Sequence, residues 1–127
     1  MINVTEKDIS SKLGLVSAVV RVLDEKQAVN IKVICVEKQT SLCNYFIICE
    51  GRSGTHVSSL ADEVIDIIGR AGAHPLHTDG IKQGNWIALD YASVIIHIFD
   101  RPSREFYSLE NIWRDGKEIP LSELTDN

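Results

Sequence analysis

Residues 86–100 are mostly apolar with few polar interruptions, and this pattern predicts a β-hairpin. A two-residue turn at Ala92 and Ser93 pairs Leu89 with Ile96 and Ile87 with Ile98, which makes one face purely aliphatic. The opposite face mixes aromatic, charged and apolar side chains, namely Trp86, Asp90, Ile95, His97 and Phe99, with Trp86 opposite Phe99. This mixture is more typical of a recognition surface or a site than of a plain core.

Two other stretches repeat apolar residues at helical spacing. The first predicts a helix that begins near Asp8 or Ser10, with a stripe of Ile9, Leu13, Val16, Val20 and Leu23. Gly14 lies inside this helix and costs about 1 kcal/mol relative to alanine. The second predicts a helix capped by Ser53 or Thr55 and ended by Gly72, with a stripe of Val57, Leu60, Ala61, Val64 and Ile68.

Strands are predicted between and after these helices. Residues 31–36 alternate, and residues 45–49 form a continuous apolar run that suits a central strand. A short segment around Pro75 and Leu76 is expected to be an edge strand, because proline cannot donate to a central ladder. Pro102 is well placed to begin a last helix, in which Phe106, Leu109 and Trp113 fall at helical spacing.

The order of these elements predicts an α/β fold, in which a mixed sheet is flanked by helices in a single domain over residues 1–114. Residues 115–127 are polar enough to be a flexible tail, although Ile119, Leu121 and Leu124 are available to dock. No internal repeat interrupts this organisation.

Composition narrows the classes of function. The chain has 127 residues, a formal net charge of -5 and a pI near 5.3, which disfavours direct binding to nucleic acid and is compatible with a basic protein partner. No apolar run approaches the roughly 20 residues that cross a bilayer, and residues 1–12 contain no signal-peptide core, so a cytoplasmic protein is expected. Cys35, Cys43 and Cys49 lack C-x-x-C spacing, and a disulfide framework is not expected.

Three groups of residues carry side chains or backbone patterns that are found in chemical sites. Gly51–Thr55 follows a strand and opens a helix, but it lacks the complete phosphate-binding motifs, and no Asp-x-Asp pair follows to hold Mg²⁺. His74, His77 and Asp79 offer metal ligands, yet exposed loop polarity explains them better. His97 lies among apolar neighbours, which favours a structural role over a base paired with Asp90 or Asp100.

The aromatic residues of the last segment also have two interpretations. Tyr107 and Trp113 on the last helix are expected to fill the core. Trp86 follows a polar loop at the mouth of the hairpin and is expected to be partly exposed, which favours a binding role because tryptophan is enriched in interface hot spots.

An ordered set of residues resembles the ribosomal silencing factor family, also called the Iojap family. The resemblance spans most of the chain and rests on Asn44–Cys49, Gly51–Ser53, His56–Val57, Ala61–Asp62, Gly72, Pro75, Asp79–Gly80, Trp86, Asp90, Val94–His97, Ser103–Arg104, Tyr107, Leu109–Glu110 and Trp113. The chain departs from the family pattern at Asn44, Thr55 and the Ala92-Ser93 turn, and each change removes a charge.

The resemblance implies a fold related to nucleotidyltransferases without their catalytic acids, no enzymatic activity and no cofactor. It implies binding to the large ribosomal subunit through its protein fourteen, so that the small subunit cannot join and translation is repressed when nutrients are short. The expected partner-binding residues are Trp86, Asp79, Asp90, His97, Arg104 and Tyr107.

Two alternatives remain open from the residues. One is a small nucleotide-binding enzyme that uses Gly51–Thr55 with Asp90 and His97. The other is a self-associating structural protein that uses the same hairpin face, which predicts a weak homodimer off the ribosome whose contact competes with ribosome binding.

Overall fold

The computed structural model describes residues 2–81 and 84–125 of the chain. Six strands form one mixed sheet in the order β3-β4-β5-β2-β1-β6. Their bounds are β1 Val29–Cys35, β2 Tyr45–Gly51, β3 His77–Asp79, β4 Trp86–Asp90, β5 Val94–Asp100 and β6 Lys117–Ile119. β2 and β5 run parallel at the centre, while the other neighbours are antiparallel. The predicted α/β fold with a mixed sheet is confirmed.

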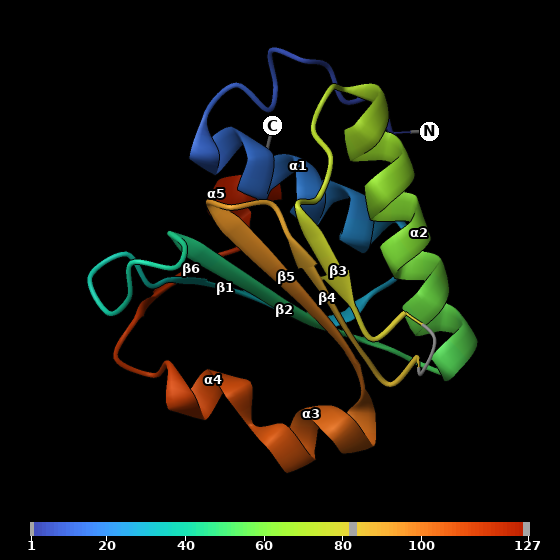
Figure 1. Cartoon of the computed structure of the whole chain (residues 1–127), viewed down its shortest axis with the longest axis vertical. Helices are drawn as coiled ribbons and strands as arrows, with labels where there is room; N and C mark the ends of the chain where they lie inside the picture. The colour runs from blue at the N-terminus through green and yellow to red at the C-terminus, as the bar shows by residue number, and fades with distance from the viewer. Residues whose placement is uncertain (1, 82–83, 126–127) are drawn as a thin grey trace.

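The helices lie on both faces of this sheet (Figure 1). α1 (Lys12–Glu25), α2 (Gly54–Arg70) and α5 (Ser122–Thr125) cover one face, and α3 (Arg101–Tyr107) and α4 (Leu109–Ile112) lie on the other. The main core lies under α1 and α2 and is almost entirely aliphatic, including Val16, Leu60, Ile47, Ile96 and Ile98. A smaller cluster under α3 and α4 contains Ile34, Phe46, Ile48 and Phe99.

The hairpin has the predicted register. Trp86 pairs with Phe99, Ile87 with Ile98 and Leu89 with Ile96. Its aliphatic face packs into the main core, so the mixed face points toward α3 and α4. Ala92 adopts a φ of 71°, and the Asp90 Oδ1 atom accepts a hydrogen bond of 2.8 Å from its backbone N–H. That bond supports a conformation that a non-glycine residue rarely adopts.

The two long helices agree with the sequence to different degrees. All five residues of the predicted α2 stripe are buried, and Ser53 caps the helix by accepting from the backbone N–H of His56 at 3.1 Å. α1 begins at Lys12 with Ser11 as its cap, so Ile9 precedes the helix. Leu13 is 47% exposed, and its predicted place in the buried stripe is wrong. The helix instead buries a wider face that includes Val19 and Val22.

Gly14 tests whether helix propensity or local packing dominates at the start of α1. A Cβ atom at this position would collide with the backbone carbonyl oxygen of Asp8. We expect Gly14→Ala to lower the free energy of unfolding by about 1–3 kcal/mol, although alanine is the better helix former. Urea unfolding measures the change.

Gly69 provides the matched control for this prediction. A Cβ atom there would meet only the side chain of His74, at 3.3 Å, and that exposed ring is able to move. Gly69→Ala should leave stability unchanged or raise it by up to about 1 kcal/mol. Equal midpoints for Gly14→Ala and the unmodified protein would refute the packing argument.

The prediction of a flexible tail from residue 115 is wrong for most of that segment. Residues Lys117–Ile119 form β6, which pairs antiparallel with β1 through Cys35↔Lys117 and Val33↔Ile119. Leu124 is buried in the main core. Composition underestimated this segment because an open sheet edge supplies backbone hydrogen-bond partners that do not depend on side-chain hydropathy.

Two further boundaries differ from the sequence prediction. The edge strand is His77–Asp79, just after the Pro75–Leu76 segment, and it pairs with β4 at the edge of the sheet. The predicted last helix is divided in two, because Ser108 adopts the left-handed conformation with φ 47° and ψ 48°. α3 therefore ends at Tyr107, and α4 changes direction after it.

Candidate functional site

The mixed face of the hairpin continues into a cluster of aromatic rings. We call Phe46, Trp86, His97, Phe99, Tyr107 and Trp113 the aromatic cluster. The Trp86 ring stacks on Phe99 with centroids 4.9 Å apart and lies 4.5 Å from the Tyr107 ring of α3. Phe46 bridges His97 at 5.2 Å and Trp113 at 5.1 Å. The cluster joins β2, β4 and β5 to the segment that contains α3 and α4.

His97 and Trp86 form a hydrogen-bonded pair within this cluster. The indole Nε1–H of Trp86 donates to Nδ1 of His97 at 3.1 Å. Nδ1 accepts only in the neutral tautomer that carries its proton on Nε2. Burial lowers the pKa of His97 to about 4, so the ring is neutral at pH 7. The Nε2 atom is buried and has no hydrogen-bond partner among residues 2–81 and 84–125.

In the part of the chain that the structure describes, His97 is hydrogen-bonded to neither Asp90 nor Asp100. Among the described residues, Asp90 Oδ1 accepts from the backbone of Ala92, and Asp100 Oδ1 accepts from the backbone of Ser103. The structural interpretation of His97 therefore fits its surroundings better than a base.

The cluster reaches the surface at α3. Phe106 is 81% exposed and contacts Tyr107 edge-on at 5.1 Å, while Tyr107 is 46% exposed. Trp86 is half-buried. The expectation that Tyr107 fills the core is wrong, because the chain turns at Ser108 before the helix can bury it. Trp113 does pack inward, against the smaller cluster.

The acidic members of the predicted partner-binding set lie apart from the cluster. Asp79 is exposed on the edge strand β3 and pairs with Ala88, so it shares a sheet face with Trp86. Asp90 ends β4, four residues beyond Trp86, which separates them by roughly 13 Å. The structure thus gathers Trp86, His97 and Tyr107, and spreads the two aspartates over the same face.

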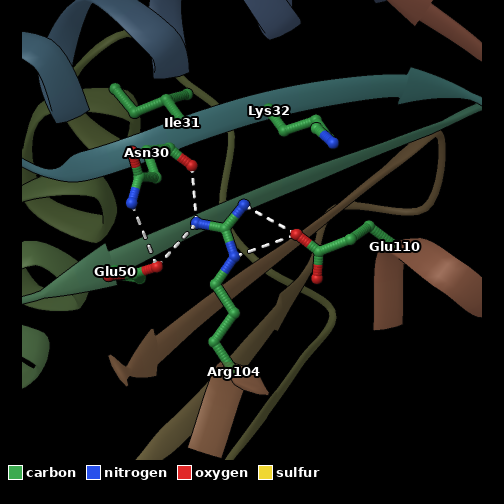
Figure 2. Close-up of a pocket in the computed structure, with 6 residues that line it drawn as sticks. All are labelled: Asn30, Ile31, Lys32, Glu50, Arg104 and Glu110. Carbon is green, nitrogen blue, oxygen red and sulfur yellow. Dashed lines mark hydrogen bonds and ion pairs between the residues drawn. The ribbon is translucent and has the colours of Figure 1, made fainter. Parts of the chain in front are cut away.

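Arg104, the remaining predicted residue, is the centre of a buried polar network (Figure 2). Its Nη1 donates to the backbone oxygen of Asn30 at 2.6 Å and to Oε1 of Glu50 at 3.3 Å. Its Nε and Nη2 donate to Oε2 of Glu110 at 3.0 and 2.8 Å. These residues line a cavity of about 370 Å³ together with Ile31 and Lys32.

Glu50 and Asn30 were missed by the sequence analysis. Asn30 has a φ of 51° and lies where the register of β1 shifts against β2, which turns its carbonyl oxygen to Arg104. Glu50 is buried directly after the apolar run of β2. A carboxylate at the end of such a run is a usable signal, because buried acids require a partner.

The charge state of Glu110 follows from the same network. Burial raises its pKa, but the hydrogen bonds and positive charge of Arg104 outweigh burial, so the pKa is lowered overall. The buried thiols behave differently. Burial raises the pKa of Cys43 to about 11 and that of Cys49 to about 12, so neither provides a thiolate at pH 7.

The residues of the nucleotide-binding alternative do not converge. Gly51 pairs with Asp100 at one end of the central strand pair, whereas Asp90 pairs with Ile95 near the other end. Part of the Gly51–Thr55 loop is also occupied, because the backbone N–H of Arg52 donates to Nδ1 of His56 at 2.9 Å. This geometry disfavours a phosphate site built with Asp90 and His97.

Within residues 2–81 and 84–125, no three histidine, cysteine, aspartate or glutamate side chains come together as metal ligands, and His74, His77 and Asp79 are all exposed. None of the helices in these ranges combines the length and hydropathy that crossing a bilayer requires.

Comparison with known proteins identifies the family. The model of a family described as "Ribosomal silencing factor during starvation" matches residues 9–127. The ribosomal silencing factor of Bacillus subtilis is 31% identical over 101 residues, covering 80% of this chain and 83% of that protein. Its counterpart in Haemophilus influenzae is 33% identical over 101 residues, covering 80% of this chain and 99% of that protein.

A solved structure agrees with these matches at the level of fold. A crystal structure of a protein from Chromobacterium violaceum aligns with a TM-score of 0.80 at 24% identity, covering 87% of this chain and 91% of that one. The names of the curated relatives describe a regulatory rather than a catalytic role. The family resemblance is thereby confirmed, and this protein belongs to the ribosomal silencing factor family.

Proposed function

We propose that this protein represses translation in the cytoplasm by binding the large ribosomal subunit through its protein fourteen and preventing the small subunit from joining. The observation that carries this proposal is the exposed end of the aromatic cluster, where the Tyr107 ring contacts both Trp86 and Phe106. The family match over residues 9–127 supports it. Obstruction needs no bond chemistry, so the proposal requires neither a cofactor nor a catalytic group.

Trp86 is proposed as the anchor of the docking surface, with Tyr107 beside it and His97 beneath it. Large aromatic side chains that are partly exposed but held by neighbours lose little conformational entropy on binding, and they dominate interface energies. Trp86 meets these conditions because Phe99, Tyr107 and the His97 hydrogen bond restrain its ring.

Asp79 and Asp90 are proposed as charged partners at the rim of this surface. Asp79 is exposed and Asp90 half-exposed on the same sheet face as Trp86, and the chain carries a net charge of -5. Charges at a rim accelerate association with a basic surface more than they tighten the final complex.

The proposal is tested by a subunit-joining assay with purified particles. Separated small and large subunits are mixed at a joining concentration of Mg²⁺, with and without the protein, and the joined fraction is measured by light scattering and sucrose gradients. We expect joining to fall with increasing protein, and the protein to co-sediment with the large subunit only. Undiminished joining at a saturating excess would refute the proposed function.

The electrostatic part has its own prediction. The association rate with the large subunit should decrease as salt rises from 50 to 300 mM, and Asp79→Asn should flatten that dependence. Asp62→Asn, at an exposed position of α2 on the opposite side of the sheet, is the matched control. An association rate independent of salt would contradict a role for rim charges. A weak homodimer of the free protein, the alternative left open by the sequence, is tested by light scattering.

A further inference from the structure

α3 is held against the sheet in an unusual way. A surface helix is ordinarily anchored by a stripe of buried apolar residues. In α3 the one buried residue is Arg104, while the large apolar side chain of Phe106 is exposed. The position of this helix therefore depends on a charged side chain together with the contact of Tyr107 with Trp86.

Arg104 connects three segments that are far apart in the chain. It reaches Asn30, 74 residues away, and Glu50, 54 residues away, in addition to Glu110 on α4. Figure 2 shows the guanidinium between the Glu50 and Glu110 carboxylates, with the Asn30 carbonyl at its Nη1 atom. The left-handed turn at Ser108 is what returns α4, and with it Glu110, to the same guanidinium.

The geometry points to Arg104 as a positioning residue: through Asn30, Glu50 and Glu110 it sets α3 so that Tyr107 lies over Trp86 and Phe106 projects outward. It contributes to ribosome binding through these aromatic side chains, not through its own contact with the partner. The role of Arg104 in ribosome binding rests on the proposed function. The placement of α3 and α4 by Arg104 does not depend on it.

Replacing Arg104 should disturb α3 and α4 and not the whole molecule, because its charged partners are buried or partly buried. Each ion of a buried pair loses hydration, so the complete network adds little net stability, but removing one partner leaves an uncompensated charge. The hydrogen-bond partners of the guanidinium within the described residues, Asn30, Glu50 and Glu110, lie outside the main core under α1 and α2. The disturbance should therefore release α3 and α4 while that core stays folded.

The test compares Arg104→Met with Arg101→Met in the full-length protein. Methionine keeps much of the length of arginine and removes the fork of donors. Arg101 lies on the same helix, but it is exposed and pairs only with Glu105 at 3.4 Å among the described residues. The chain has two tryptophans, and both lie on the α3 and α4 face, so their emission reports on this region.

For Arg104→Met we expect a red shift of tryptophan emission and faster quenching by acrylamide. We also expect hydrogen exchange in α3 and α4 at least about tenfold faster, with exchange in α1, β5 and α2 unchanged. Arg101→Met should match the unmodified protein in all three measurements. Unchanged emission and exchange in Arg104→Met would overturn the inference, and so would equally faster exchange throughout the core.

Glu110→Gln and Arg104→Lys keep the inference testable if Arg104→Met does not fold. Glu110→Gln removes one charge of the network and should speed exchange in α4 more than in α1. Arg104→Lys retains the charge but not the fork, so it should rescue the emission only in part. Full rescue by lysine would show that charge alone is sufficient and would overturn positioning by the fork.

Binding to large subunits is measured separately on the same variants. Released helices with weaker binding support both the inference and the docking surface. Released helices with unchanged binding support the placement of α3 by Arg104 and refute the docking surface proposed above. The two failures are therefore distinguishable.

Discussion

Trp86→Ala should weaken binding to the large ribosomal subunit by about 2 kcal/mol or more, which corresponds to a roughly 30-fold higher dissociation constant. The substitution removes the ring that stacks on Phe99 and contacts Tyr107, and it also removes the donor to His97. The substitution therefore removes the area that Trp86 would bury against the ribosome, and it also removes the ring that holds Tyr107 in place. Binding is measured by co-sedimentation over a range of protein concentrations at fixed salt.

Trp113→Ala is the matched control for this experiment. Trp113 belongs to the same aromatic cluster, but it packs on Phe46 under α4 and not beside the exposed rings of α3. If Trp86 anchors the interface, Trp113→Ala should weaken binding far less at an equal folded fraction, which circular dichroism verifies. Equal losses in the two variants would mean that the cluster acts only through folding.

His97 should produce the second large effect, an acid-dependent loss of stability. Its pKa is 6.5 in the unfolded chain and is lowered by burial to about 4 in the folded protein. Between these values the unfolded state binds a proton that the folded state does not, so stability decreases as the pH falls. Above pH 6.5 His97 does not lower the free energy of unfolding. By the time the pH reaches 4, its titration has lowered the free energy of unfolding by about 3 kcal/mol.

Urea unfolding at pH 7.0 and pH 4.5 measures this loss. In His97→Asn the side-chain oxygen occupies a position similar to Nδ1, so it retains an acceptor for the Trp86 indole without a titrating group. We expect a clearly smaller difference between the two midpoints in this variant than in the unmodified protein. If His97→Asn lost as much stability between pH 7.0 and pH 4.5 as the unmodified protein, the acid sensitivity would arise from other groups.

The parts of the site that the sequence predicted are local in the chain. The pairs Trp86 with Phe99 and Leu89 with Ile96 lie within one hairpin, where a period of two and a short turn determine which side chains share a face. The stripe of α2 is similarly local. The exposed position of Phe106 was not predicted, because helical spacing continues through Ser108 and contains no signal for its left-handed conformation.

The sequence alone therefore determined the α/β class, the central strands, the hairpin register, the α2 helix and the family, because each depends on residues close together or on an ordered set of residues. Only the tertiary structure revealed the pairing of β6 with β1 and the network that joins Arg104 to Asn30 and Glu50. These contacts cross 54 residues or more, and their energies arise from backbone partners and buried charges that exist only after the sheet has formed.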